Sequence, residues 1–460
     1  MLNLDTAARA IGAGRRGPNA SFDGVTTDSR QVAHGDLFVA LKGDRFDGHA
    51  YVDQALEQGA AGALVADVEH VHRRNAPLIL VDDTRLALGK LAAHWRTRFH
   101  IPVVAVTGSN GKTSVKEMVA AILRAAAGDK AVLATSGNLN NDIGLPLTLL
   151  HLRSHHRYAV IEMGMNHLGE ISYLTQLTHP TVALVNNAGV AHIGELGSRD
   201  AIAQAKGEVY EGLADGGIAV INADDSFAQY WRGLNAKRRI IDFGVEQPAS
   251  VGAKYELTAD GSMVTVRTPD TQYVVRLQVP GLHNVRNALA ACAVAHALGI
   301  APAAVARGLL EFEGAKGRLQ SKPCRGGGVL IDDTYNANPD SVKAAIAVLA
   351  SVPGSRILVL GDMGELGDDA STLHAQIGAA AKQAGIERLL TLGELSEAAA
   401  KSFGAGGSHF RDVEALCKTL EGLLGEKVTV LVKGSRFMRM ERVAWRFIDG
   451  EPTHAHEAEH

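Results

Sequence analysis

The sequence predicts an α/β protein made of three consecutive domains. Its 460 residues are 46% hydrophobic, and this length is typical of about three domains with their own cores. From residue 100 onward, apolar runs of strand length alternate with amphipathic helical segments, a pattern typical of mostly parallel sheets covered by helices. A more polar, β-rich stretch at 250–279 separates two such series. We therefore expect domains at 1–98, 99–314 and 315–460.

The N-terminal domain mixes short strands with helices and is expected to be a small α/β unit. Its apolar runs predict strands at 36–41, 63–65 and 78–81, and helices at 51–58 and 86–99.

The two later domains each predict an open, mostly parallel sheet. The central domain has strand-like runs at 103–107, 158–162, 181–185 and 217–222, and an Ala-rich helix at 284–298. The C-terminal domain repeats the alternation with runs at 328–332, 356–361, 388–392 and 428–433.

A phosphate-binding loop connects the first central strand to the following helix. The sequence Gly-Ser-Asn-Gly-Lys-Thr at 108–113 is a shortened Walker motif, because Val106 stands where the usual first glycine would be. Backbone N–H groups of such a loop and the helix N-terminus converge on one anion, which predicts a P-loop ATPase-like domain. Lys112 is expected to reach the outer phosphates and Thr113 to ligate Mg²⁺. A plain Gly-rich turn before a helix is the alternative. The expected ATP contacts in this stretch are Thr107, Gly108, Ser109, Asn110, Gly111, Lys112, Thr113 and Ser114.

Two polar side chains follow neighbouring strands at the same predicted sheet edge. Glu162 ends the second central strand, and His192 lies beyond the third. Because ligands of open parallel sheets bind at the carboxyl ends of the strands, both are expected to face the triphosphate as ligands of Mg²⁺ or Mn²⁺. For His192, a hydrogen-bonded structural histidine is the alternative.

Composition excludes several classes of partner. The net charge of −4 and the lack of a basic block argue against nucleic acid. No apolar run approaches bilayer-spanning length and the N-terminus lacks a leader pattern, so we expect a cytoplasmic protein. Cys292, Cys324 and Cys417 show no paired spacing, and neither a disulfide framework nor a zinc site is predicted.

Further motifs resemble those of the Mur ligase superfamily along nearly the whole chain. They are Asp28-Ser-Arg30, Gly137-Asn-Leu-Asn-Asn141, His283-Asn-Val-Arg-Asn287, Asp333-Thr-Tyr-Asn-Ala-Asn-Pro339 and Lys433-Gly-Ser-Arg436. Within the superfamily the chain resembles the members that add D-alanyl-D-alanine to UDP-N-acetylmuramoyl-tripeptide through an acyl phosphate, giving the UDP-muramoyl-pentapeptide precursor of peptidoglycan. The resemblance implies an N-terminal UDP-sugar domain, a central ATPase and a C-terminal Rossmann-like domain, and we expect a monomer.

The resemblance also implies roles for individual residues. The catalytic set is Lys112, Glu162, His192 and Lys206, with two Mg²⁺ ions held by Thr113, Glu162, His192 and a carbamylated Lys206. A solvated helix lysine is the alternative for Lys206. Asn284, Asn287, Arg318 and Asp333 are implied to contact ATP, although Asn284 could instead cap its helix.

Substrate contacts are implied in the two outer domains and one central segment. The UDP-sugar and its peptide are assigned to Ser29, Arg30, Lys42, Arg45, Phe46, Asp47, His49, Thr135, Asn138, Asn140 and Asn141. D-Ala-D-Ala is assigned to Tyr335, Asn336, Asn338, Ser341, Lys433 and Arg436, with a turn before a helix as the alternative at Asn338-Pro339. The roles of Asp362, Glu365 and His374 stay open.

Two other functions remain as alternatives. A sibling ligase, either folylpolyglutamate synthase-like or the Mur ligase that adds the third residue, shares the phosphate loop. The latter carries an Asp-Asn-Pro-Arg-type motif, whereas Tyr-Asn-Ala-Asn-Pro stands here at 335–339. A nucleotide switch is the non-enzymatic alternative, and the sequence has no guanine-recognition motif to support it. Whether the third residue of the tripeptide is lysine or diaminopimelate is not predicted.

Overall fold

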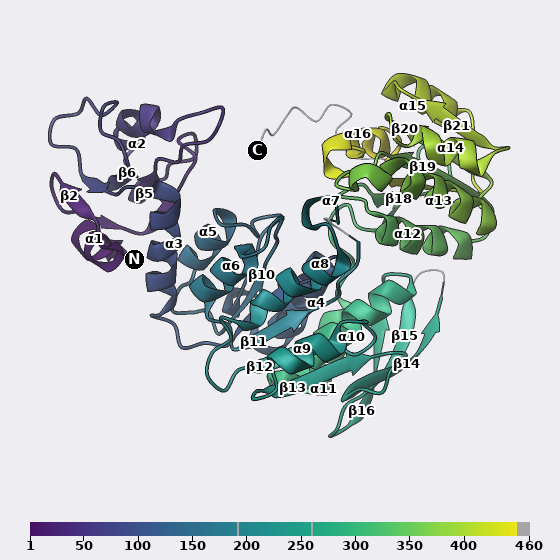
Figure 1. Cartoon of the computed structure of the whole chain (residues 1–460), viewed down its shortest axis with the longest axis horizontal. Helices are drawn as coiled ribbons and strands as arrows, with labels where there is room; N and C mark the ends of the chain where they lie inside the picture. The colour runs from purple at the N-terminus through teal and green to yellow at the C-terminus, as the bar shows by residue number, and fades with distance from the viewer. Residues whose placement is uncertain (191–192, 259–260, 449–460) are drawn as a thin grey trace.

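A computed structural model describes residues 1–190, 193–258 and 261–448 of the chain. Three large sheets succeed one another along the sequence, and the five-stranded N-terminal and six-stranded C-terminal sheets lie at opposite ends of an elongated molecule (Figure 1). The predicted α/β class with three units is confirmed. No helix in the described part of the chain combines the length and apolarity needed to cross a bilayer.

The N-terminal unit contains a five-stranded sheet in the order β2-β7-β6-β5-β4 and a two-stranded sheet of β1 and β3. Its strands are β1 (Leu2–Asn3), β2 (Gly14–Arg16), β3 (Ser21–Phe22), β4 (Gly24–Thr26), β5 (Asp36–Val39), β6 (Gly62–Val65) and β7 (Leu78–Leu80). Its helices are α1 (Leu4–Ile11), α2 (Val52–Glu57) and α3 (Thr84–Arg96).

The central sheet has nine strands in the order β16-β15-β14-β13-β12-β11-β8-β10-β9. The strands from β9 to β14 pair in parallel, and β14, β15 and β16 then form an antiparallel edge. Their bounds are β8 (Val103–Thr107), β9 (Val132–Ala134), β10 (Tyr158–Glu162), β11 (Val182–Val185), β12 (Ile218–Asn222), β13 (Arg239–Gly244), β14 (Val251–Leu257), β15 (Ser262–Arg267) and β16 (Gln272–Leu277).

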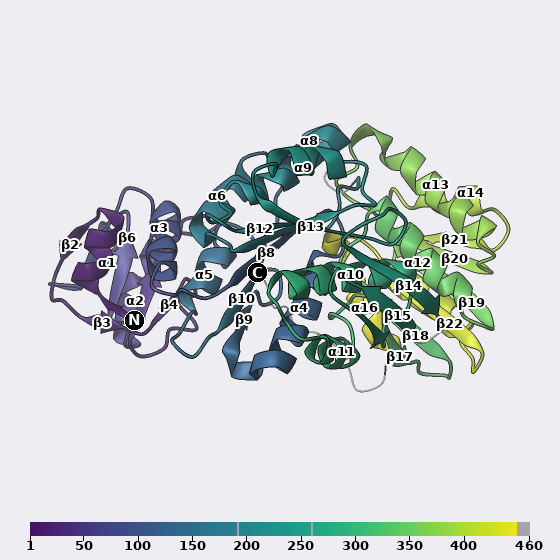
Figure 2. The ribbon, with the colours of Figure 1, turned by 90° about the horizontal axis from the view of Figure 1, so that it is seen from below.

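Helices cover both faces of the central sheet, as Figure 2 shows. One face packs on α4 (Lys112–Ala127), α10 (Leu282–Ala297) and α11 (Pro302–Leu310). The other faces α5 (Gly144–Leu150), α6 (Glu170–Thr178), α8 (Arg199–Gly207) and α9 (Ala228–Leu234), while the short α7 (Ile193–Leu196) precedes α8. Strand β8 is therefore buried on both faces, which explains its unbroken run of apolar residues.

The N-terminal unit shares a hydrophobic core with the central one. A single cluster of buried residues runs from Leu4 and Phe22 through α3 to the α5–α6 face of the central sheet. Buried hydrogen bonds reinforce it, because Trp95 Nε1 donates to the Leu152 carbonyl at 3.1 Å and Arg96 Nε to that of Thr178 at 3.0 Å. These two units are consequently packed as one body.

The C-terminal unit has a six-stranded sheet in the order β17-β18-β22-β19-β20-β21, parallel except for β17. Two core clusters, formed only by residues from 319 onward, fill its two faces. The strands are β17 (Gln320–Pro323), β18 (Val329–Asp333), β19 (Ser355–Gly361), β20 (Arg388–Leu392), β21 (Gly407–Phe410) and β22 (Val428–Lys433). The helices are α12 (Pro339–Ser351), α13 (Ala370–Gln383), α14 (Glu397–Phe403), α15 (Val413–Glu421) and α16 (Glu441–Ala444).

Candidate active site

The carboxyl ends of the central strands open into a cavity of about 1330 Å³. The phosphate loop after β8 and Glu162 at the end of β10 both line it, as expected for an open parallel sheet. The start of α3 forms part of its wall on the N-terminal side, and residues of the C-terminal unit, including Arg318 and Tyr335, close it from the other side.

The phosphate loop is held in a conformation that needs glycine. Gly111 has φ of 77°, and a Cβ placed there would lie 2.3 Å from Asn287 Oδ1. Helix α4 begins directly afterwards at Lys112, so its N-terminus points into the loop. This geometry suits the loop for the anion that the sequence predicts there.

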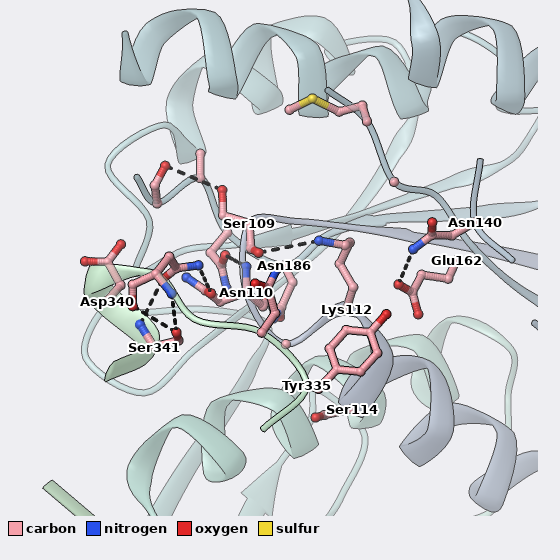
Figure 3. Close-up of a pocket in the computed structure, with 18 of the residues that line it drawn as sticks. Ser109, Asn110, Lys112, Ser114, Asn140, Glu162, Asn186, Tyr335, Asp340 and Ser341 are labelled. Atoms are coloured by element: carbon pink, nitrogen blue, oxygen red, sulfur yellow. Dashed lines mark hydrogen bonds between the residues drawn. The ribbon is translucent and has the colours of Figure 1, made fainter. Parts of the chain in front are cut away.

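Two asparagines that follow β11 hold this loop in place through hydrogen bonds. Asn186 Nδ2 donates to the Asn110 carbonyl at 2.9 Å and to Asn287 Oδ1 at 3.0 Å (Figure 3). Asn187 Oδ1 accepts from the Asn110 N–H at 2.8 Å. Neither residue was among the predicted contacts, although their place at the end of a parallel strand was a usable signal. Asn287, assigned to adenine from the resemblance, lies in this network.

Lys112 folds back over the loop that it follows. Its Nζ donates to the Gly108 carbonyl at 2.7 Å and to the Ser109 carbonyl at 3.4 Å, and Figure 3 shows the second of these bonds. Burial lowers the pKa of this amine, and the charge of Arg318 acts in the same direction, whereas Glu162 opposes it. An anion placed in the loop would offset that burial and give the ammonium a new partner.

Glu162 and Lys206 are buried residues with unsatisfied polar atoms, and of the two only Glu162 lines the cavity. Glu162 is 2% exposed, and its Oε1 accepts from Asn140 Nδ2 at 2.8 Å. Among the described residues, neither Glu162 Oε2 nor Lys206 Nζ has a hydrogen-bond partner. Lys206 is fully buried, so the solvated-lysine alternative is wrong. Burial, reinforced by the charge of Lys112, holds the pKa of Lys206 well below its ordinary value.

The structure describes only some of the residues that were predicted to hold metal at this edge. His192 lies outside the described residues. Within the described residues, no group of three or more His, Cys, Asp or Glu side chains could hold a metal ion. The buried, unpaired Glu162 oxygen is nevertheless the kind of atom that a hard cation would satisfy.

The C-terminal unit reaches the phosphate loop through polar side chains. Arg318 Nη2 donates to Thr113 Oγ1 at 3.1 Å, and its guanidinium stacks on the Tyr335 ring at 4.2 Å. Lys433 Nζ pairs with Asp333 at 2.7 Å, and burial raises the pKa of that carboxyl despite the nearby cation. The structure thus brings Arg318 and Asp333, both expected to contact ATP, to the cavity.

Two residues assigned to D-Ala-D-Ala have a structural task. Asn338 and Ser341 form a capping box at the start of α12, with Asn338 Oδ1 accepting from the Ser341 N–H at 2.9 Å. The turn before a helix, which is the alternative interpretation of Asn338-Pro339, is therefore present. Asn338 Nδ2 also donates to Asn110 Oδ1 at 2.8 Å, which ties α12 to the phosphate loop. Both residues still line the cavity.

Two other residues assigned to D-Ala-D-Ala and one assigned to ATP each have a partner within the protein. Asn336 accepts from Lys433 Nζ through its carbonyl at 2.8 Å, and Arg436 pairs with Glu441 at 2.9 Å. Asn284 is not the helix cap, because α10 begins at Leu282; its Nδ2 donates to the Pro280 carbonyl at 2.8 Å.

The residues assigned to the UDP-sugar lie in a separate part of the N-terminal unit. None of Ser29, Arg30, Lys42, Arg45, Phe46, Asp47 and His49 lines the cavity described above. Asp47 and buried His49 are tied together at 2.6 Å, and His49 Nε2 accepts from the Ala66 N–H at 2.9 Å. Hydrogen bonds from His49 hold the Asp47 pKa at about 2.

The central segment assigned to the sugar or peptide divides into two groups. Asn138, Asn140 and Asn141 line the cavity, whereas Thr135 lies behind it. Thr135 Oγ1 accepts from the Glu162 N–H at 3.0 Å, so it supports the end of β10.

Two residues with open roles are structural cross-links. The Asp362 carboxylate accepts from the N–H groups of Glu394 at 2.9 Å and Ser396 at 2.8 Å, and buried His374 accepts from the Met363 N–H at 2.9 Å. The Glu365 carbonyl accepts from the Gly194 N–H at 3.0 Å and so contacts the central unit.

Comparison with known families gives the class of this protein. Family models match at residues 21–96 (Mur ligase family, catalytic domain), 106–295 (Mur ligase middle domain) and 317–436 (Mur ligase, glutamate ligase domain). The chain belongs to the Mur ligase family.

Several individual proteins within this family are similar to the chain over nearly its whole length. The UDP-N-acetylmuramoyl-tripeptide–D-alanyl-D-alanine ligase of Escherichia coli (strain K12) is 45% identical over 93% of this chain and 94% of its own. A crystal structure of MurF from Acinetobacter baumannii is 36% identical, with a TM-score of 0.89 over 96% of this chain and 98% of that one. The MurF ligase of Thermotoga maritima in complex with ADP is 29% identical, with a TM-score of 0.79 over 92% and 96% of the two chains.

Proposed function

We propose that this chain is an ATP-dependent ligase that joins D-alanyl-D-alanine to UDP-N-acetylmuramoyl-tripeptide. Relatives named for that activity match it over nearly their whole length. The observation that carries the proposal is that the phosphate loop and Glu162 line one cavity, while the buried Lys206, which has no hydrogen-bond partner among the described residues, lies close enough to Lys112 to feel its charge.

The chemistry explains why a phosphate loop is needed. A carboxylate resists attack by an amine because it is already anionic, so its oxygen first takes the γ-phosphoryl group of ATP and ADP leaves. The dipeptide amine then attacks the acyl carbon, the C–O bond to phosphate breaks, and an amide, phosphate and a proton result. Lys112 and the loop N–H groups would neutralise charge on the transferring phosphoryl group.

A divalent cation fits the residues around Glu162. Glu162 would hold it through its unpaired Oε2, together with the Thr113 hydroxyl, and bound Mg²⁺ supplies charge neutralisation at the phosphates. We propose two Mg²⁺ ions, with Mn²⁺ as a substitute.

Carbamylation of Lys206 would supply the further anionic ligand. Its lowered pKa favours the neutral amine, which adds to CO₂ to give a carbamate and a proton. That reaction replaces a cation that repels the metal with an anion that attracts it.

The three domains would bind the three substrates. We propose that residues 1–98 hold the UDP-sugar, that Asn138, Asn140 and Asn141 contact its peptide, and that 99–314 binds ATP with Asn284 and Asn287. Residues 315–460 would supply Arg318 and Asp333 to ATP. They would also supply Tyr335, Asn336, Asn338, Ser341, Lys433 and Arg436 to the dipeptide.

The test is release of ADP and phosphate by the purified chain with Mg²⁺, ATP, UDP-muramoyl-tripeptide and D-Ala-D-Ala, with mass detection of the pentapeptide product. Turnover that requires both acceptor and tripeptide is the expected result. Hydrolysis independent of both would instead indicate a nucleotide switch. A preference for a single amino acid or a folate substrate would indicate a sibling ligase.

A further inference from the structure

Arg85 is a cation at the junction between the N-terminal and central units. It is the second residue of α3, whose start is capped by Asp83 through the Arg85 N–H at 2.8 Å. The far end of α3 is fixed to the central unit by Trp95 and Arg96. Helix α3 also packs on α5 and α6 (Figure 1), so the Arg85 backbone has a fixed place relative to the catalytic edge.

The Arg85 side chain is aligned by a carboxylate from the central unit. Its Nη2 donates to Asp142 Oδ1 at 2.7 Å, its Nε pairs with Asp142 Oδ2, and both residues line the cavity. Asp142 belongs to the segment that contains Asn140, and Asn140 donates to Glu162. The ion pair therefore lies on the cavity wall between the N-terminal unit and Glu162. The Arg85 side chain remains 56% exposed, and the Nη1 side of its guanidinium, opposite the edge that Asp142 contacts, has N–H groups to offer a ligand.

Several other basic side chains that line the cavity belong to the central and C-terminal units and already have partners there. Arg318 contacts Thr113, Lys433 pairs with Asp333, and Arg286 pairs with Glu246. Among the described residues that line the cavity, Arg85 is the one lysine or arginine from the N-terminal unit.

The tripeptide substrate carries carboxylates that do not react, an argument that rests on the proposed function. The Acinetobacter baumannii ligase is named for a substrate with D-glutamyl and 2,6-diaminopimelate residues. A glutamyl residue in a peptide keeps one free carboxylate, and a terminal diaminopimelate keeps another at the end of its chain away from the reacting carboxylate. A peptide that runs from the N-terminal unit to Lys112 must bring these charges past α3.

We propose that Arg85 binds a non-reacting carboxylate of the tripeptide, with Asp142 holding the guanidinium in place before the substrate arrives. A guanidinium can bind a carboxylate through two parallel N–H···O bonds, and it discriminates against a neutral amide at the same position. Arg85 is thus a specificity-determining residue for the peptide part of the nucleotide substrate. The carboxylate comes either from the glutamyl residue or from diaminopimelate.

The experiment compares wild type with Arg85→Ala and Arg85→Gln, the second keeping most of the side-chain volume. Lys90→Ala is the matched control, because Lys90 is an exposed cation of the same helix that does not line the cavity. The KM and Kd of the UDP-tripeptide should rise about tenfold in both Arg85 variants. The KM values of ATP and D-Ala-D-Ala should stay constant, and Lys90→Ala should match wild type.

Two altered substrates identify the carboxylate. One has the glutamyl carboxylate converted to a carboxamide, and the other has lysine in place of diaminopimelate. The penalty of Arg85→Gln should vanish on the substrate that lacks the bound carboxylate. An unchanged Kd in both variants, or the same tenfold penalty on both altered substrates, would overturn the assignment. Lack of pentapeptide formation by wild type would instead refute the proposed function.

Discussion

Replacing Lys206 with methionine should stabilise the protein while abolishing ligation. The Lys206 amine is fully buried and, among the described residues, has no hydrogen-bond partner. A buried polar group without a partner costs about 1–3 kcal/mol, and methionine fills a similar volume without that cost. For a cooperative unit of this size, the variant should melt about 2–6 °C higher than wild type in CO₂-free buffer.

The pH dependence of the difference has a definite sign. The folded pKa of Lys206 lies below its ordinary value, so the unfolded chain binds more protons than the folded one between those two pKa values. The contribution of Lys206 to stability therefore rises with pH across that window and is lost as the pH falls through it. The advantage of Lys206→Met should be largest at the acidic end and shrink toward alkaline pH.

Thermal melting with and without bicarbonate and Mg²⁺ is the assay, followed by phosphate release on the same samples. Bicarbonate should raise the melting temperature of wild type, because carbamylation of Lys206 in the folded state stabilises that state. The melting temperature of Lys206→Met should stay unchanged. A variant that melts below wild type in CO₂-free buffer would show that the amine has a favourable partner. Retained turnover would remove Lys206 from the catalytic set.

Three further substitutions test other parts of the structure. Gly111→Ala forces a Cβ against Asn287 and a left-handed φ on alanine, so equilibrium titration should show loss of ATP binding with an unchanged far-UV spectrum; ordinary ATP affinity would contradict the loop geometry. Arg318→Ala should raise the KM of ATP about tenfold and leave the Kd of the UDP-tripeptide unchanged; equal effects on both would indicate a general defect. Asp362→Ala leaves buried N–H groups without an acceptor and should lower the melting temperature by several degrees, whereas the exposed Asp368→Ala should not; equal melting of the two variants would refute this.

Long apolar strands of the sheets were predictable because burial on both faces leaves a continuous apolar run. The strands predicted at 103–107, 158–162 and 388–392 have those bounds in the structure. Short strands such as β1 and β9 were missed, because two or three residues give no readable period. The β-rich stretch was predicted only as a block, and the helix at 284–298 begins two residues earlier, at Leu282.

The site was predictable where one sheet edge determines it. Parallel pairing of β8 with β10 brings Glu162 to the phosphate loop, and the position of each in the sequence indicates this. The pair of Arg85 and Asp142 joins residues 57 positions apart across a domain boundary, so no local pattern predicts it. Asn338 was ambiguous for a different reason, since the same side chain suits a ligand contact and a helix cap.

The attachment of the C-terminal unit differs in kind from that of the N-terminal unit. The N-terminal unit shares an apolar core with the central one, whereas Arg318 and Asn338 contact the phosphate loop itself through hydrogen bonds. A metal ion bound to the Thr113 hydroxyl would compete with Arg318 for that oxygen and would free the guanidinium for phosphate. Ligand binding can shift a domain only by its differential affinity for the two arrangements, and exchange of such polar contacts supplies one. We therefore expect nucleotide binding to act on the position of the C-terminal unit and to leave the N-terminal unit, with Arg85, in place.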